Sequence, residues 1–181
     1  VIRGATNASG RTIGLRSDMD ALPILEATGK AWASQTPGKM HACGHDGHAA
    51  MLLGAAIGLA ESRNFDGTVV LIFQPAEEGG AGARAMIEDG LFRRFPVDEV
   101  YGMHNRPGMA VGEFTIAPGP IMGSIDMFEI EIEGVGGHAA MPDRTTDPMP
   151  VVAALIQAAQ TIAARNVDPL EAARSEERRV G

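Results

Sequence analysis

Apolar residues in the N-terminal part of the chain follow two spacings, one typical of strands and the other of helices. Residues 67–74 form a continuous β-branched and aromatic run, which indicates a central parallel strand. Two further strands are predicted at 11–18 and 97–104, and apolar residues at helical spacing predict helices over 46–64 and 79–92. Strands separated by helices of this length predict an α/β fold with a doubly wound, mostly parallel sheet.

The pattern changes near residues 116–124, where prolines and glycines indicate a linker. Beyond it, residues 125–135 alternate between apolar and acidic side chains, which predicts a half-exposed antiparallel strand. Residues 148–166 are typical of an amphipathic helix with proline in its first turn. We therefore expect a second, smaller α+β unit after the linker. The final residues, 172–181, turn abruptly charged and carry no strand pattern.

Composition and charge restrict the class of protein. An apolar fraction of 45% over 181 residues suits a globular core, and no apolar run approaches the roughly 18 residues of a membrane span. The net charge of −8 argues against a nucleic-acid partner, because binding phosphates requires a basic surface. A single cysteine excludes an intramolecular disulfide and favours a reducing, cytoplasmic location. No signal-peptide pattern opens the chain, and the missing initiator methionine predicts a piece of a longer protein.

Acid, imidazole and thiol groups gather where the predicted strands end. Acidic or histidine side chains follow each strand of the predicted sheet, and a cysteine and a histidine precede the helix at 46–64. Ligands bind at the carboxyl edge of open α/β sheets, so we expect these groups to share that edge. The residues concerned are Asp18, Cys43, His45, Glu77, Glu78 and His104.

This set of donors suits a metal ion. Thiolate, imidazole and carboxylate together bind borderline transition ions such as Zn²⁺, Mn²⁺ or Co²⁺. Successive side chains in a non-helical loop point apart, so one of Glu77 and Glu78 can bind metal while its neighbour acts as general base toward a metal-bound water. A metal lowers the pKa of that water from about 15.7 towards about 7, which makes amide hydrolysis the reaction that the set suits.

Each of these residues also has a simpler interpretation. Cys43 alone is more often a small buried apolar residue than a ligand, and His104 could be a hydrogen-bonded core imidazole. Adjacent acids are common at the start of a helix. We expect His48 to be a solvated residue at a helix start, and His41 could be solvated in a loop. Two other function classes remain open: a metal-independent hydrolase with the Cys43 thiol as nucleophile, and a metal-binding module without turnover.

Short segments along the chain resemble the dinuclear metal amidohydrolases. This family includes hippurate hydrolase, N-acyl-amino-acid amidohydrolases and auxin-conjugate hydrolases. The resemblance covers roughly residues 1–171, with the segments in the family's order and spacing. The segments are SDMDALPI (17–24), MHACGHDGH (40–48), QPAEEGGAGA (74–83), GMHNRPG (102–108) and GGHAAMP (136–142).

The resemblance implies a role for each candidate residue. Glu77 would be the general base, and Asp18 lies where the wider metallopeptidase family carries an aspartate that steadies the metal site. Arg16 stands where that family usually has a histidine, which fits the branch in which a cysteine supplies a ligand instead. His138 matches a histidine of the smaller domain that contacts the substrate carboxylate or the tetrahedral oxyanion. The implied metal ligands are Cys43, His45, Glu78 and His104.

The resemblance also implies how the whole enzyme is organised. Residues 1–117 would belong to a catalytic domain, incomplete at both ends, and 118–171 to part of a lid and dimerisation domain through which the full-length protein can form a homodimer. Each full-length subunit would bind two divalent ions, drawn from Mn²⁺, Zn²⁺, Co²⁺ and Ni²⁺, and hydrolyse a small N-acyl amino acid, hippurate-like or related. A further histidine ligand would come from outside this chain, so we expect the chain alone to be inactive.

Overall fold

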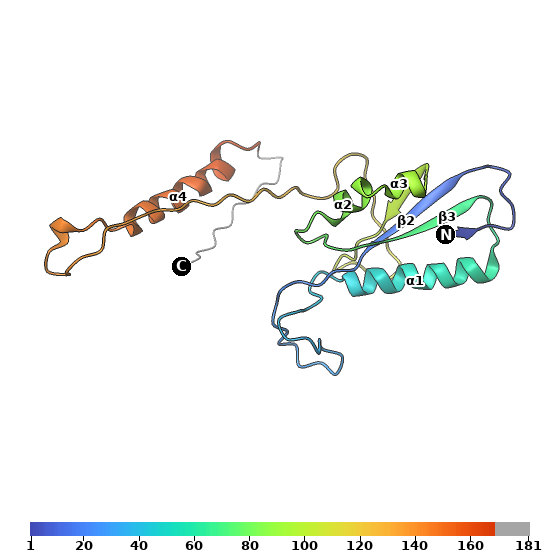
Figure 1. Ribbon diagram of the computed structural model, residues 1–181, viewed down its shortest axis with the longest axis horizontal. Helices are drawn as coiled ribbons and strands as arrows, with labels where there is room; N and C mark the ends of the chain where they lie inside the picture. The colour runs from blue at the N-terminus through green and yellow to red at the C-terminus, as the bar shows by residue number, and fades with distance from the viewer. Residues whose placement is uncertain (169–181) are drawn as a thin grey trace. The chain divides into compact units, whose positions relative to one another are not determined.

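The computed structural model describes residues 1–168. These residues fall into two compact units, of which the first is Val1–Phe114 and the second begins at Thr115 (Figure 1). The charged tail expected at 172–181 lies outside the described residues. The assignment of residues 1–117 to a catalytic domain and of 118–171 to a lid domain stays a prediction.

A four-stranded sheet forms the centre of the first unit. Its strands are β1 (Ile2–Arg3), β2 (Thr12–Asp18), β3 (Thr68–Gln74) and β4 (Glu99–Gly102). They lie in the order β1-β3-β2-β4, so β2 is flanked by β3 and β4 and runs parallel to both. The short β1 pairs antiparallel with β3. The predicted α/β class, with a mostly parallel sheet, is confirmed.

Helix α1 (His45–Ser62) links β2 to β3 and packs along one side of the sheet (Figure 1). The chain enters the helix through Gly44, whose φ of 91° lies in the left-handed region that favours glycine. The helix predicted at 46–64 is therefore confirmed. None of the described helices combines the length and the hydropathy that crossing a membrane requires.

The segment 79–92 was predicted as one helix and is two in the structure. Helix α2 (Gly82–Glu88) is followed at once by the short α3 (Leu91–Arg94). Gly90, between them, has a φ of 94°. A left-handed glycine ends a helix because the following backbone can no longer continue the same hydrogen-bond ladder. The apolar residues keep helical spacing on both sides of Gly90, so this spacing could not predict the break between the two helices.

The core of the first unit lies on both faces of β3. Val69, Val70 and Ile72 of β3 are buried, together with Leu52 of α1. This confirms the interpretation of 67–74 as a central strand with both faces covered. At the carboxyl ends of β2 and β3 the buried residues become polar, with Asp18 and Gln74 facing each other across the two strands.

The second unit contains a 3₁₀ turn, η1 (Pro142–Arg144), and helix α4 (Met149–Arg165). The helix predicted at 148–166 is confirmed, with Pro150 in its first turn. The strand predicted at 125–135 is wrong for the described structure, where this segment is extended but forms only an isolated bridge at Val135. Alternating apolar and polar residues show which face of a strand would be buried, but a strand also needs a partner strand for its backbone N–H and C=O groups.

Candidate metal centre

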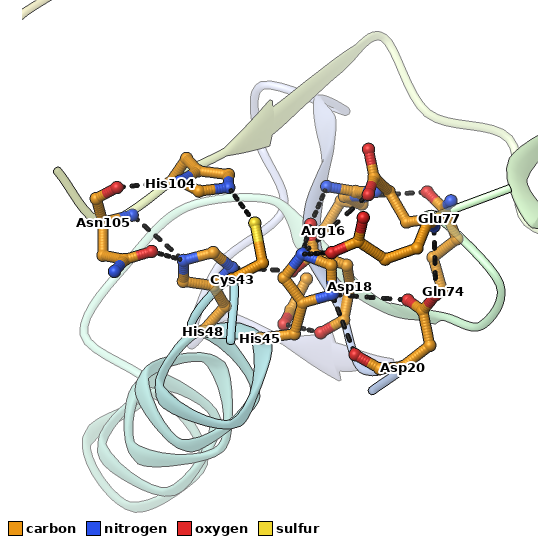
Figure 2. A network of polar contacts seen from close by, with 12 residues as sticks. Arg16, Asp18, Asp20, Cys43, His45, His48, Gln74, Glu77, His104 and Asn105 are labelled. Carbon is orange, nitrogen blue, oxygen red and sulfur yellow. Dashed lines mark hydrogen bonds and ion pairs between the residues drawn. The ribbon is translucent and has the colours of Figure 1, made fainter. Parts of the chain in front are cut away.

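Four chain segments bring the predicted site residues of the first unit together at the carboxyl edge of the sheet (Figure 2). Asp18 ends β2, and Cys43 and His45 lie at the start of α1. The turn after β3 carries the two glutamates, and the loop after β4 carries His104. Potential ligand atoms lie within 4.8 Å of one another in three overlapping groups that share His45, namely Cys43–His45–His104, Asp18–His45–His48 and His45–Glu77–Glu78.

His45 is the centre of this arrangement and is only 1% exposed. Its Nδ1 lies 3.0 Å from the backbone oxygen of Asp20, and because a carbonyl only accepts, Nδ1 carries the proton. The opposite atom, Nε2, is buried and has no hydrogen-bond partner in the described structure. Three carboxylate oxygens surround it, from Asp18 at 3.7 Å, Glu78 at 3.7 Å and Glu77 at 3.9 Å. A lone pair facing carboxylates fits a cation between them.

Cys43 and His104 form the second half of the site. The Cys43 sulfur lies 3.4 Å from Nε2 of His104. Nδ1 of His104 is 2.8 Å from the backbone oxygen of Asn105 and donates to it, so Nε2 directs its lone pair toward the sulfur. Burial and the negative charge of Glu78 raise the pKa of the Cys43 thiol. A bound cation would reverse this effect and favour the thiolate.

Asp18 is buried and has both carboxylate oxygens occupied. Arg16 donates to one oxygen at 2.8 Å, and Nδ1 of His48 lies 2.6 Å from the other. Burial alone would raise the pKa of Asp18, but the hydrogen bond from His48 and the charge of Arg16 outweigh it and hold that pKa below its usual value. Arg16 is itself held by Gln74, whose side-chain oxygen accepts from Nε at 2.8 Å. These contacts suit an aspartate that steadies the site.

Asp20 is a site residue that the sequence analysis did not single out. Its backbone oxygen accepts from His45, and its carboxylate accepts the backbone N–H of Glu78 at 3.0 Å. Burial raises the pKa of Asp20, but the backbone donors of Glu78 and Glu77 outweigh it and lower that pKa overall. Asp20 therefore joins the start of α1 to the glutamate turn. Its spacing of two from Asp18, just past the strand, was the available signal.

His48 was expected to be solvated, and that expectation is wrong. The side chain is only 2% exposed and lies between Asp18 and Asn105. Its separation of three residues from His45 places both histidines on one face of α1, which is the signal that could have shown it. His41, in the preceding loop, is exposed.

The glutamates lie in a tight turn and do not start a helix. α2 begins only at Gly82, where an added Cβ would lie 1.8 Å from the backbone oxygen of Pro75. Ala76 and Ala81 flank the pair with φ values of 52° and 50°, in a left-handed region that costs alanine energy. Strained backbone of this kind concentrates at functional sites. The turn holds Glu77 and Glu78 against the sheet edge.

His138 lies in the second unit and is exposed. Its Nδ1 accepts the backbone N–H of Ala140 at 3.1 Å, which fixes the ring within a glycine-rich segment. The contact of His138 with substrate stays a prediction.

Comparison with known proteins identifies the family. The sequence profile of peptidase family M20/M25/M40 matches residues 14–176. The chain belongs to this family. The resemblance inferred from the motifs of the metal centre is thereby confirmed.

Relatives within the M20 family include enzymes with named amide substrates. N-acetyl-L-cysteine deacetylase of Bacillus subtilis is 51% identical over 93% of this chain and 40% of its own length. Hippurate hydrolase of Campylobacter jejuni is 50% identical over 91% of this chain and 43% of its own length. A dinuclear metal-binding M20 peptidase of Bacillus subtilis has a crystal structure that matches with a TM-score of 0.57 and 47% identity, over 61% of this chain and 30% of its own. The chain thus spans less than half the length of these relatives.

Proposed function

We propose that the whole protein is a metal-dependent amidohydrolase that cleaves the amide bond of N-acyl amino acids, with a hippurate-like or related acyl group. The observation that carries this proposal is the buried, unpartnered Nε2 of His45 among carboxylate oxygens. The names of two relatives, N-acetyl-L-cysteine deacetylase and hippurate hydrolase, support N-acyl amino acids as the substrate class.

Two divalent ions per full-length subunit, drawn from Mn²⁺, Zn²⁺, Co²⁺ and Ni²⁺, fit this donor set. The proposed ligands are Cys43, His45, Glu78 and His104, whose sulfur, nitrogen and oxygen donors suit borderline ions. When bound, such an ion lowers the pKa of a coordinated water from about 15.7 towards about 7 and polarises the substrate carbonyl.

The acid–base work falls to the protein. The side chain of Glu77 is 42% exposed, whereas that of Glu78 is 25% exposed, so Glu77 is the more accessible to water and substrate. We assign Glu77 as the general base that takes the proton of the attacking water and delivers it to the leaving amine. Asp18 steadies the metal site, and His138 stabilises the oxyanion or binds the substrate carboxylate.

A metal-independent thiol hydrolase is the second candidate, and the 3.4 Å contact between Cys43 and His104 favours it. Such an enzyme needs a thiolate, which a neighbouring imidazole can generate. Burial and the nearby acids raise the pKa of Cys43, and this opposes the thiolate in a metal-free site. A metal-binding module without turnover is the third candidate.

One experiment separates the three candidates. The whole protein is assayed against a panel of N-acyl amino acids before and after treatment with a chelator, and its metal content is measured in parallel. We expect turnover that the chelator abolishes and added Mn²⁺ or Zn²⁺ restores. Turnover that survives complete removal of metal would support the thiol hydrolase, and bound metal with no turnover on any substrate would support the module.

The remaining proposals concern the whole protein. We propose a cytoplasmic enzyme that forms a homodimer through its smaller domain, with residues 1–117 in the catalytic domain and 118–171 in the lid. Light scattering of the purified whole protein measures the mass in solution, and a monomer at micromolar concentration would contradict the dimer.

A further inference from the structure

The loop that carries His104 has few attachments to the rest of the chain. The loop follows β4, which ends at Gly102, and its backbone–backbone hydrogen bonds join residues that are close in sequence. Within residues 1–168, the loop segment 103–113 makes hydrogen bonds to distant parts of the chain at two places, from His104 to Cys43 and from Asn105 to His48. The first of these involves the proposed metal ligands themselves. The contact between Asn105 and His48 therefore attaches the loop to α1 without using a proposed metal ligand.

Asn105 rests against the start of α1, at Gly44. Its backbone nitrogen lies 3.0 Å from Nε2 of His48, and its side-chain oxygen lies 2.7 Å from the same atom. An added Cβ on Gly44 would lie 2.5 Å from that side-chain oxygen. Glycine at position 44 thus leaves the space that Asn105 occupies, in addition to adopting the left-handed φ of 91°.

His48 transmits this attachment to the sheet. The backbone N–H of Asn105 can only donate, so Nε2 of His48 accepts, and Nδ1 carries the proton that is donated to Asp18 at 2.6 Å. Nε2 then cannot donate to the side-chain oxygen of Asn105, so that side chain adds a hydrogen bond only when its amide is turned to direct the –NH2 group at Nε2. The ring is buried, and its centroid lies 4.6 Å from that of His104. The series Asp18–His48–Asn105 therefore connects β2, α1 and the loop after β4 (Figure 2).

We propose that His48 and Asn105 are positioning residues that hold His104 against Cys43 so that both can bind the same ion. This inference rests on the proposed metal-dependent function. Without the attachment, metal binding would have to order the loop, and the free energy spent on ordering would be lost from the affinity. Partners behind metal ligands typically contribute about 10–100-fold to metal affinity, and we expect a loss of this size.

The test is a Zn²⁺ titration of the metal-free whole protein in competition with a chelating dye. The variants are Asn105→Ala, which removes the side chain that lies against Gly44 but keeps the backbone N–H, and His48→Ala, which removes the acceptor of that N–H. His48→Gln is the conservative variant, because its amide can donate to Asp18 and accept from Asn105. His41→Ala is the matched control, an exposed histidine of the same segment. Circular dichroism melts of the metal-free proteins record folding independently of metal.

We expect Asn105→Ala and His48→Ala to bind zinc about 10–100-fold more weakly at one site, with partial recovery in His48→Gln and no change in His41→Ala. Zinc concentrations that shield Cys43 of the parent protein from iodoacetamide should fail to shield it in the weakened variants. If the parent binds zinc and both Asn105→Ala and folded His48→Ala bind it equally well, the positioning role is wrong while the proposed function stands. If the parent binds no divalent ion at all, the proposed function fails and this inference fails with it. Should His48→Ala not fold, Asn105→Ala and His48→Gln decide the question.

Discussion

Nε2 of His45 and Oε1 of Glu78 lie 3.7 Å apart, although neither can donate a proton to the other while Nδ1 of His45 donates to Asp20. Two donors bound to one zinc ion at about 2.1 Å stand about 3.4 Å apart in tetrahedral coordination. The observed separation is close to that value. A buried imidazole nitrogen that faces a carboxylate at this distance is costly without a cation, so the pair is the strongest single indication of a metal site.

Substitution of the two adjacent glutamates should affect metal content and activity differently. In the whole protein, Glu77→Gln should retain metal and lose activity by about 10²–10⁴-fold, because it removes the proposed proton acceptor. Glu78→Gln should lose metal as well as activity, because it weakens a proposed ligand. Metal content by mass spectrometry and kcat are the measurements, with Glu88→Gln, an exposed glutamate of α2, as control. Equal metal loss in both variants would refute this division.

Metal should protect the only cysteine from alkylation. Because burial and nearby acids raise the pKa of Cys43, the metal-free thiol should react slowly with iodoacetamide at neutral pH. Saturating Zn²⁺ should reduce the rate further, since the sulfur is then bound. Cys43→Ser should weaken metal binding and leave the circular dichroism spectrum recognisable. Identical alkylation rates with and without metal would show that Cys43 is not a ligand.

Removal of the Asp20 carboxylate should disturb the glutamate turn, while the backbone oxygen that accepts from His45 remains. Asp20→Ala deletes the acceptor of the Glu78 N–H, so the glutamate turn should loosen. We expect metal affinity or kcat to fall by about 10–100-fold, with a smaller loss in Asp20→Asn, which keeps an acceptor oxygen. Asp66→Ala is the control, because Asp66 also accepts backbone N–H groups but precedes the opposite end of β3. Equal activity in Asp20→Ala and the parent would exclude this role.

Asp66 should make folding stability depend on acid. The hydroxyl of Thr6 donates to it at 2.6 Å, and with the donors of Ser9 and Ala8 it holds the pKa of Asp66 below its usual value. A carboxyl whose pKa is depressed by folding stabilises the protein above its unfolded pKa of about 3.9, and this contribution is lost as pH falls below that value. Asp66→Asn should therefore be less stable than the parent at pH 6, and the difference in Tm should shrink at pH 3. A difference that stays constant over this range would contradict the assignment.

The location of the metal centre could be predicted largely from local sequence. β3 was visible because a buried parallel strand is a short apolar run, β2 and β4 because each is a short segment next to a predicted helix, and parallel strands must end at one edge. Any acid or histidine just past such a strand therefore lies at that edge. This argument placed Asp18, the glutamate pair and His104 together, and the structure bears out their proximity. Their individual roles stay predictions.

The amino-acid sequence by itself thus determined the order β2, α1, β3, β4 in the first unit and the chemical character of its sheet edge, because periodicity and strand polarity are local properties. The short β1 and the division between α2 and α3 were not predicted. Only the tertiary structure decided which groups face each other. Asp20 joins His45 to the glutamate turn, and His48 is buried between Asp18 and Asn105. Likewise, residues 125–135 alternate as a strand should, yet this segment lacks the ladder of a strand within the described chain. Hydrogen-bond partners come from residues distant in sequence, and a local pattern shows which face is polar without showing what that face will meet.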